Sequence, residues 1–469
     1  MTEAQALNGC GTRNRARVRA VRLTGLTLIM LAISGCATRV WNEPIEKLQA
    51  GHAYDFRSRL PDNADDLFVV LAFSGGGTRS AAFAYGVLEK FRDTKVMIDG
   101  QQRRLLDEVD VITSVSGGSF TAAYYGLFGD RIFTDFGTRF LLRDVQSALY
   151  QQIFNPGHLV SLASGAFNRS DLVARWFGRE LFDHKTFNDI SLGSLPFVII
   201  NASDLNNGAT FAFIQQQFDF LCSSLSGYPV ANAVAASSAV PGVFATIALR
   251  NYASCPQRQA PWVSQALADD DQLDRRYAVA RALERYSRPD RMPAVRLVDG
   301  GVTDNLGVRG SMMSPVAHYG NVPDMAGAFS EEKLAKVRQV LVVVANAQVY
   351  REFDLSLGGD EPGIIEAATA SFDAALGILN TETASLAKQG FEMWGRRINA
   401  SRGADKPPVK VYFSVLTFNH ISDRDQRDYF ETLPTAFRLD PQAVDAVSRL
   451  AGQLLDESPE FNQFVETLN

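Results

Sequence analysis

The chain of 469 residues is 46% hydrophobic and 21% charged, which is typical of a globular protein that buries a sizeable core. Its formal net charge of −6, with no polybasic patch after the N-terminal segment, argues against a nucleic-acid-binding protein. No group of Cys and His residues has the spacing of a metal site, so the sequence implies no bound metal.

Residues 1–35 have the features of a secretory signal, because five arginines precede a short apolar stretch, residues 23–34. That stretch ends in Ile33-Ser34-Gly35-Cys36, which resembles the lipobox of bacterial lipoproteins, whose cysteine is lipidated and becomes the new N-terminus. We therefore expect lipidation at Cys36, with attachment to a membrane of the bacterial cell envelope, facing the periplasm or the outer membrane. Several acyl chains, such as palmitate, would hold the protein firmly. An uncleaved anchor or an ordinary signal peptide is the alternative.

After a polar stretch, residues 36–66, which predicts a tether and surface segment, the chain alternates between strand and helix patterns. Apolar runs predict strands at residues 67–73, 108–113, 196–201, 295–298, 340–345 and 409–415. Helical patterns lie at residues 80–91, 119–128, 364–398 and 441–455. This alternation predicts an α/β fold with a mainly parallel central sheet between two layers of helices. Residues 67–345 would form the main domain, and residues 346–469 would complete it or pack on it.

Residues 254–293 interrupt this alternation and predict an insertion, for which a surface helical hairpin is favoured over a lid. Apart from Cys10 and Cys36, the chain has two cysteines, Cys222 and Cys255. In an oxidising compartment they would form a disulfide, but two free buried thiols fit the sequence equally well.

Three short motifs follow predicted strands, and in open α/β sheets ligands bind at the carboxyl ends of strands. They are Ser74-Gly75-Gly76-Gly77-Thr78-Arg79-Ser80, Ser114-Val115-Ser116-Gly117-Gly118 and Asp299-Gly300-Gly301. In this order they resemble the glycine-rich loop, serine elbow and Asp-Gly-Gly turn of the patatin-like phospholipases. The resemblance covers roughly residues 67–310. It includes Arg169-Ser170-Asp171-Leu172 and the block of residues 236–244.

The resemblance implies a three-layer α/β/α patatin-like fold and a serine ester hydrolase. Ser116 would be the nucleophile, on a sharp turn whose small neighbours are Gly118 and Ser114, the latter standing where the family usually has glycine. Backbone amides from Gly75, Gly76, Gly77 and Thr78 would form the oxyanion hole. Arg79 would brace this loop, and Ser80, in place of the family's final glycine, would open the helix.

Asp299, in its turn with Gly300 and Gly301, would act as the base of a Ser-Asp dyad. A Ser-Asp-His triad is the alternative, because His318 and His420 both follow Asp299 in the chain. The expected activity is hydrolysis of carboxylic esters of membrane lipids, with phospholipids as the leading substrates and no cofactor. A general carboxylesterase or lysophospholipase, or a non-catalytic lipoprotein that binds lipid, are the other interpretations.

Overall fold

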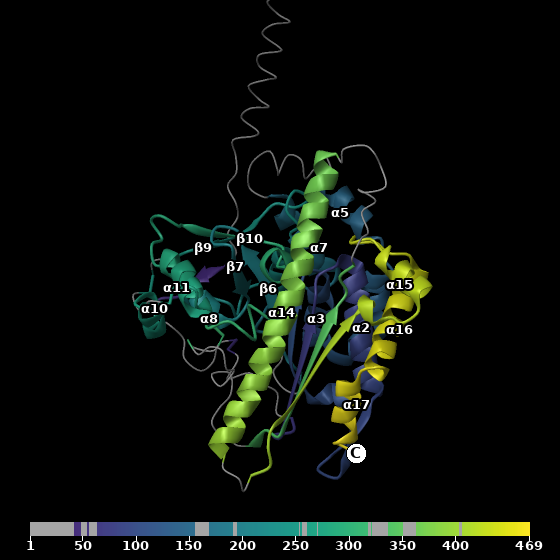
Figure 1. Ribbon diagram of the computed structural model, residues 1–469. Helices are drawn as coiled ribbons and strands as arrows, with labels where there is room; N and C mark the ends of the chain where they lie inside the picture. Colours follow the sequence, from purple (N-terminus) through teal and green to yellow (C-terminus); the bar gives the residue numbers. More distant parts are fainter. Residues whose placement is uncertain are drawn as a thin grey trace, which may run out of the picture.

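A computed structural model of the chain describes residues 42–47, 54–55, 63–154, 168–190, 195–252, 254–255, 260–269, 271–317, 320, 336–349, 363–402 and 406–469. Its centre is an eight-stranded sheet with helices on both sides (Figure 1). The strands follow the order β12-β11-β2-β5-β6-β10-β9, and β7 pairs with β6 beside this path. Their bounds are β2 (Leu67–Phe73), β5 (Val109–Val115), β6 (Phe197–Asp204), β7 (Ala209–Ala212), β9 (Ile247–Arg250), β10 (Ala294–Val298), β11 (Gln339–Asn346) and β12 (Lys410–Thr417).

Five neighbouring strands, from β12 to β6, are parallel. Every residue of β2, β5 and β6 is buried, and β2 accordingly consists of apolar residues alone, with no polar alternation. The six strands predicted from apolar runs correspond to β2, β5, β6, β10, β11 and β12. The sheet is therefore mixed but mostly parallel, as the sequence predicts.

The handedness of the crossovers separates the helices into two layers. The connections from β2 to β5 and from β5 to β6 step across the sheet in one direction, and they carry α2 (Gly77–Asp93) and α3 (Gly117–Phe128). The connection from β11 to β12 steps in the opposite direction and carries α14 (Ile364–Arg402). Because parallel crossovers are right-handed, α14 lies on the face opposite α2 and α3. Figure 1 shows α14 passing in front of the sheet, from the top of the domain to its lower left.

The C-terminal region belongs to the same domain. Strand β12 extends the sheet beside β11, and α16 (Pro441–Asp456) packs on α2. The remaining elements are β1 (Glu43–Pro44), β3 (Lys95–Ile98), β4 (Gln101–Arg104), β8 (Ser223–Ser224), η1 (Leu105–Glu108), η2 (Gly129–Arg131), α4 (Ile132–Phe136), η3 (Gly137–Leu141), α5 (Val145–Phe154), α7 (Arg169–Glu180), α8 (Gln215–Asp219), α9 (Val230–Ser237), α10 (Pro261–Leu267), α11 (Arg275–Tyr286), α12 (Gly301–Asp304), η6 (Phe418–His420), α15 (Arg424–Glu431) and α17 (Pro459–Glu466).

Strand β10 differs from the simplest expectation, because it runs antiparallel to β6. The two strands pair only at Leu297 with Asp204 and at Val298 with Ser203. Strand β10 therefore ends beside the last residues of β6, and Asp299 follows immediately. The Asp-Gly-Gly turn reaches the carboxyl edge of the parallel strands from the opposite direction.

The described part of the predicted tether is attached to the domain. Strand β1 pairs with β8, and the buried Tyr54 hydroxyl donates a hydrogen bond of 2.7 Å to the Val198 carbonyl. Cys222 and Cys255 form a disulfide, which resolves the alternative that the sequence leaves open. The predicted signal segment and Cys36 lie outside the described residues. Within the described ranges, no helix is long and apolar enough to span a membrane.

Candidate active site

Ser116 occupies a strained turn between β5 and α3. Its φ of 49° and ψ of −118° are rare for a residue other than glycine, and such strain persists only where the surrounding structure imposes it. The two following glycines are required by close packing. A Cβ at Gly117 would collide with the carbonyl oxygen of Gly77, and a Cβ at Gly118 would lie 2.7 Å from the Cβ of Phe73. Ser114 is a buried strand residue whose hydroxyl donates to the Ile199 carbonyl.

The structure brings Ser116 and Asp299 together across 183 positions of sequence. The Ser116 hydroxyl donates a hydrogen bond of 2.8 Å to Asp299 Oδ2, and the Gly301 N–H donates one of 2.8 Å to Asp299 Oδ1. Burial raises the pKa of the Asp299 carboxyl from 3.8 to about 6, although these two hydrogen bonds oppose the rise. The side chain is thus a stronger base than an exposed aspartate while remaining ionised near neutral pH.

Ser237, at the end of α9, holds both halves of this pair. Its hydroxyl accepts a hydrogen bond of 2.8 Å from the Ser116 N–H and donates one of 2.6 Å to the Asn201 carbonyl. Its carbonyl accepts the Gly300 N–H at 3.1 Å, and the Ala239 carbonyl accepts the Asp299 N–H at 2.9 Å. In the sequence, Ser237 is marked only by the resemblance of residues 236–244 to the family. Only the fold reveals this positioning role, because its partners come from three distant segments.

The glycine-rich loop connects β2 to α2 and lies beside the elbow. Gly76 and Gly77 have positive φ values of 142° and 63°, which explains the glycines at these positions. The Gly75 N–H donates to the Asn305 carbonyl at 3.0 Å, and the Thr78 N–H donates to the Ala436 carbonyl at 2.9 Å.

Two of the four amides expected to form the oxyanion hole are therefore engaged elsewhere. The N–H groups of Gly76 and Gly77 donate to no described residue, and Gly77 borders the same pocket as Ser116. Because an oxyanion hole needs free donors aimed at the reacting oxygen, Gly76 and Gly77 fit the expectation better than Gly75 and Thr78.

Arg79 braces the loop against the C-terminal region. Its buried guanidinium donates to the Ala347 carbonyl at 2.9 Å, to the Leu433 carbonyl, and to the Thr435 hydroxyl at 3.0 Å. The Ser80 hydroxyl donates to the carbonyl of Ser74 at the start of the loop. The expected bracing role of Arg79 agrees with these contacts, and its hydrogen-bonding groups face the protein rather than the pocket.

Ser116 lines a mostly apolar pocket with a volume of about 380 Å³. The other lining residues come from the glycine-rich loop, α5, the start of α7, the segment after α9 and the segment before α16; they are Gly77, Gln146, Leu149, Tyr150, Ile153, Arg169, Val240, Val243, Phe244, Thr435, Ala436 and Phe437. No motif in the sequence marks residues 435–437 as part of the pocket wall. A larger cavity of about 780 Å³, lined mainly by charged residues near the start of β2 and β11, does not suit an acyl chain.

The predicted alternatives to the Ser-Asp pair find little support in this geometry. His420 is exposed at the end of η6, and His318 lies outside the described residues. Among the described residues, the hydrogen bonds to the Asp299 carboxylate come from Ser116 and Gly301 and from no histidine. In the described part of the chain there is also no group of His, Cys, Asp or Glu that would hold a metal ion.

The insertion at residues 254–293 contains α10 and α11, which pack on each other as a helical hairpin. In Figure 1 both helices lie at the left edge of the view, whereas α5 and α7 lie near the top. None of the described residues of the insertion lines the pocket at Ser116. The two helices therefore form a hairpin outside the described lining of this pocket.

Comparisons with known proteins add the family. The sequence model of the family described as patatin-like phospholipase matches residues 71–311, a range that includes all three motifs. No curated protein sequence matches the chain. Human GIVD cytosolic phospholipase A2 is 12% identical with a TM-score of 0.33, and the similarity covers 60% of this chain and 45% of that one. VipD from Legionella pneumophila is 11% identical with a TM-score of 0.28, covering 83% and 67%. The similarity thus spans less than half the length of the human enzyme.

Proposed function

Because this chain belongs to the patatin-like phospholipase family, we propose that it hydrolyses carboxylic esters of membrane lipids with a Ser116–Asp299 dyad. The observation that carries the proposal is the 2.8 Å hydrogen bond between the two side chains at the base of an apolar pocket. A hydroxyl that donates to a buried carboxylate, on a turn exposed to an apolar cavity, suits nucleophilic attack on the ester of a long-chain acid.

The proposed reaction has two steps. Ser116 Oγ attacks the ester carbonyl carbon while Asp299 accepts the hydroxyl proton, and the N–H groups of Gly76 and Gly77 stabilise the oxyanion. As the tetrahedral intermediate collapses, Asp299 gives the proton to the leaving alcohol and the acyl group stays on Ser116. Water then attacks the acyl-enzyme, Asp299 takes a proton from this water, and the proton returns to Ser116 Oγ as the fatty acid leaves.

The direct test is labelling with a fluorophosphonate, followed by mass spectrometry of the modified peptide. We expect the label on Ser116, with no labelling in Ser116→Ala and no hydrolysis of a p-nitrophenyl ester or a phospholipid by that variant. Ser119→Ala is the matched control, because Ser119 is a buried serine of the same turn whose hydroxyl contacts Ser237 and not Asp299. Labelling of another residue, or near-wild-type activity of Ser116→Ala, would contradict the assignment.

The substrate class is tested separately. A lipid hydrolase should turn over phospholipid in vesicles with a higher kcat/KM than a short soluble ester, because the apolar pocket gains more from a long acyl chain. Equal or better turnover of the short ester would favour a general carboxylesterase. Strong lipid binding without turnover of either substrate would favour a lipid-binding lipoprotein that does not act as an enzyme.

We also propose that the protein is anchored to the bacterial cell envelope through lipidated Cys36. The support is the sequence Ile33-Ser34-Gly35-Cys36 after a basic and apolar leader. The N-terminal peptide of the mature protein should begin at Cys36 and carry the mass of a diacylglycerol. Cys36→Ser should remain an unprocessed precursor. A mature wild-type protein that starts elsewhere, without acyl mass on Cys36, would contradict this proposal.

A further inference from the structure

Arg169 is the only residue with a formal charge among the described residues that line the pocket at Ser116. It is the first residue of α7, and its side chain is exposed to solvent. The remaining lining residues are apolar or neutral. A single positive charge therefore borders a cavity that otherwise suits a hydrocarbon chain.

The backbone on both sides of Arg169 is fixed to the pocket wall. The Asn168 side chain accepts the Asp171 N–H at 2.9 Å and donates to the Thr246 carbonyl at 3.2 Å. The Ser170 hydroxyl donates to the Ala245 carbonyl. Residues 245 and 246 directly follow the Val240 to Phe244 segment of the pocket wall. The position of Arg169 relative to the pocket is thus set by hydrogen bonds from both of its neighbours.

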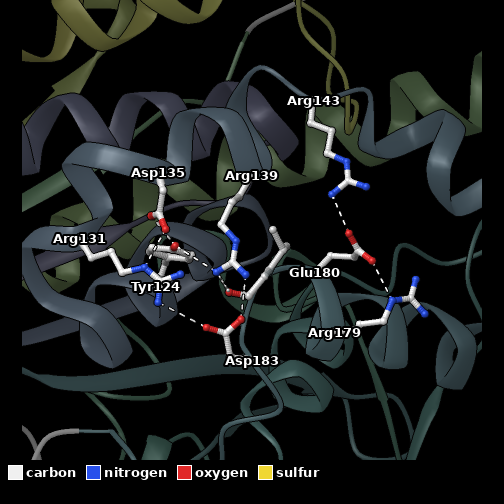
Figure 2. A network of polar contacts seen from close by, with 9 residues as sticks. Tyr124, Arg131, Asp135, Arg139, Arg143, Arg179, Glu180 and Asp183 are labelled. Atoms are coloured by element: carbon white, nitrogen blue, oxygen red, sulfur yellow. Dashed lines mark hydrogen bonds and ion pairs between the residues drawn. The ribbon is translucent and has the colours of Figure 1, made fainter.

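The guanidinium of Arg169 forms no hydrogen bond or ion pair with a described residue. By contrast, Figure 2 shows a polar network that includes Arg179, near the other end of α7, and in this network each arginine contacts a carboxylate. Arg143 and Arg179 share Glu180, at 3.0 and 2.7 Å. The other ion pairs in this view join Arg131 to Asp135 at 2.7 Å and to Asp183 at 3.4 Å, and Arg139 to Asp183 at 2.8 Å. Within the part of the chain that the structure describes, the charge of Arg169 at the pocket mouth is therefore not engaged by another residue.

We propose that Arg169 binds the phosphate of a phospholipid substrate while the acyl chain occupies the apolar pocket and the ester faces Ser116. This inference rests on the proposed function. In a glycerophospholipid the phosphodiester is attached to the same glycerol unit as the acyl esters, so an anion always accompanies the scissile bond. A diacylglycerol or a simple ester has no such group. Arginine suits this role because its planar guanidinium forms two parallel hydrogen bonds to phosphate oxygens.

Arg169 would accordingly determine specificity for phospholipids over neutral lipids. A charge-assisted hydrogen bond contributes about 1.5–3 kcal/mol, which corresponds to about a 10- to 160-fold difference in kcat/KM. Arg79, which lies in the glycine-rich loop, is not available for this role, because its guanidinium is buried and donates to the C-terminal region.

The test compares hydrolysis of phosphatidylcholine and diacylglycerol with identical acyl chains, each in the same detergent micelles. Arg169→Gln should lower the ratio of the two kcat/KM values by about tenfold or more, and Arg169→Lys should restore part of it. Arg179→Gln is the matched control, because Arg179 is an exposed arginine of the same helix that pairs with Glu180 outside the pocket. Its ratio should equal that of the wild type. An unchanged ratio in Arg169→Gln would overturn the proposal.

A binding measurement separates this inference from the proposed function. Calorimetry with dihexanoylphosphatidylcholine and dihexanoylglycerol, on Ser116→Ala protein with and without Arg169→Gln, requires no turnover. Loss of Arg169 should weaken binding of the phospholipid about tenfold or more, with a smaller effect on the neutral lipid. Equal effects on both ligands would overturn the role of Arg169. A wild-type protein that hydrolyses neither lipid would instead contradict the proposed function and leave this comparison of affinities valid.

Discussion

The buried carboxylate of Asp299 predicts how hydrolysis depends on pH. Because the base must be ionised to accept the Ser116 proton, kcat/KM should follow the ionised fraction of a group whose pKa is about 6. Activity should rise about tenfold per pH unit in acid, reach half of its maximum near pH 6 and level off above pH 7. An exposed aspartate would instead give a plateau that begins near pH 5.

The same burial predicts a change in stability with pH. Because folding raises the pKa of Asp299 from 3.8 to about 6, the folded state holds the proton more tightly than the unfolded state. The free energy of unfolding therefore falls as pH increases from about 4 to about 6 and then becomes constant. Two pKa units correspond to about 3 kcal/mol, and about half of this is lost by pH 5.

Asp299→Asn should separate these two consequences. The amide cannot accept the proton, so the variant should be inactive at every pH. It also carries no charge, so it should be more stable than the wild type by up to about 3 kcal/mol at pH 8 and by less at pH 5.

Urea denaturation of both proteins at pH 5 and pH 8 measures the stability difference, and initial rates with a p-nitrophenyl ester from pH 4.5 to 8 measure the activity profile. Taking the difference between the two proteins removes the contribution of all other titrating groups. A flat activity profile between pH 5 and pH 8 would refute the argument from burial. A variant that is less stable than the wild type at pH 8 would refute it too.

Three further predictions concern the loop, the disulfide and the pocket mouth. Gly77→Ala should lower kcat at least about 10²-fold, because the φ of 63° at this position disfavours a side chain and the new Cβ would collide with Ala436. A kcat near that of the wild type would contradict the proposed oxyanion hole. Replacing Cys222 and Cys255 by serine should lower the free energy of unfolding by about 3–4 kcal/mol, because the disulfide closes a loop between residues 33 positions apart. Equal urea midpoints of the wild-type protein with and without reductant would argue against the disulfide. Val243 is 49% exposed at the pocket mouth, so Val243→Asp should reduce the hydrolysis of phospholipid in vesicles more than the hydrolysis of a soluble ester. Equal reductions for the two substrates would exclude a role of Val243 in contacting lipid.

Much of the fold and of the chemistry could be predicted from local patterns in the sequence. The segment that forms β2 and the middle of β11 are continuous apolar runs, and such runs have no polar face that could remain in water. Ser116 and Asp299 can be identified from the sequence because each lies in a short motif directly after a segment that predicts a strand. The glycines of the loop and the elbow indicated tight turns, and tight turns are a local property of the backbone.

Only the tertiary structure decided how these pieces meet. The run at β10 looks the same whether its strand is parallel or antiparallel, and the structure makes it antiparallel to β6. The amides of Gly75 and Thr78 are engaged by Asn305 and Ala436, which no local pattern connects to the loop. Ser237 acquires its role from equally distant partners. Apolar strands and tight turns depend on residues that are close in the sequence, so local patterns predict them. Strand direction and hydrogen-bond partners depend instead on which distant segments the folded chain brings into contact.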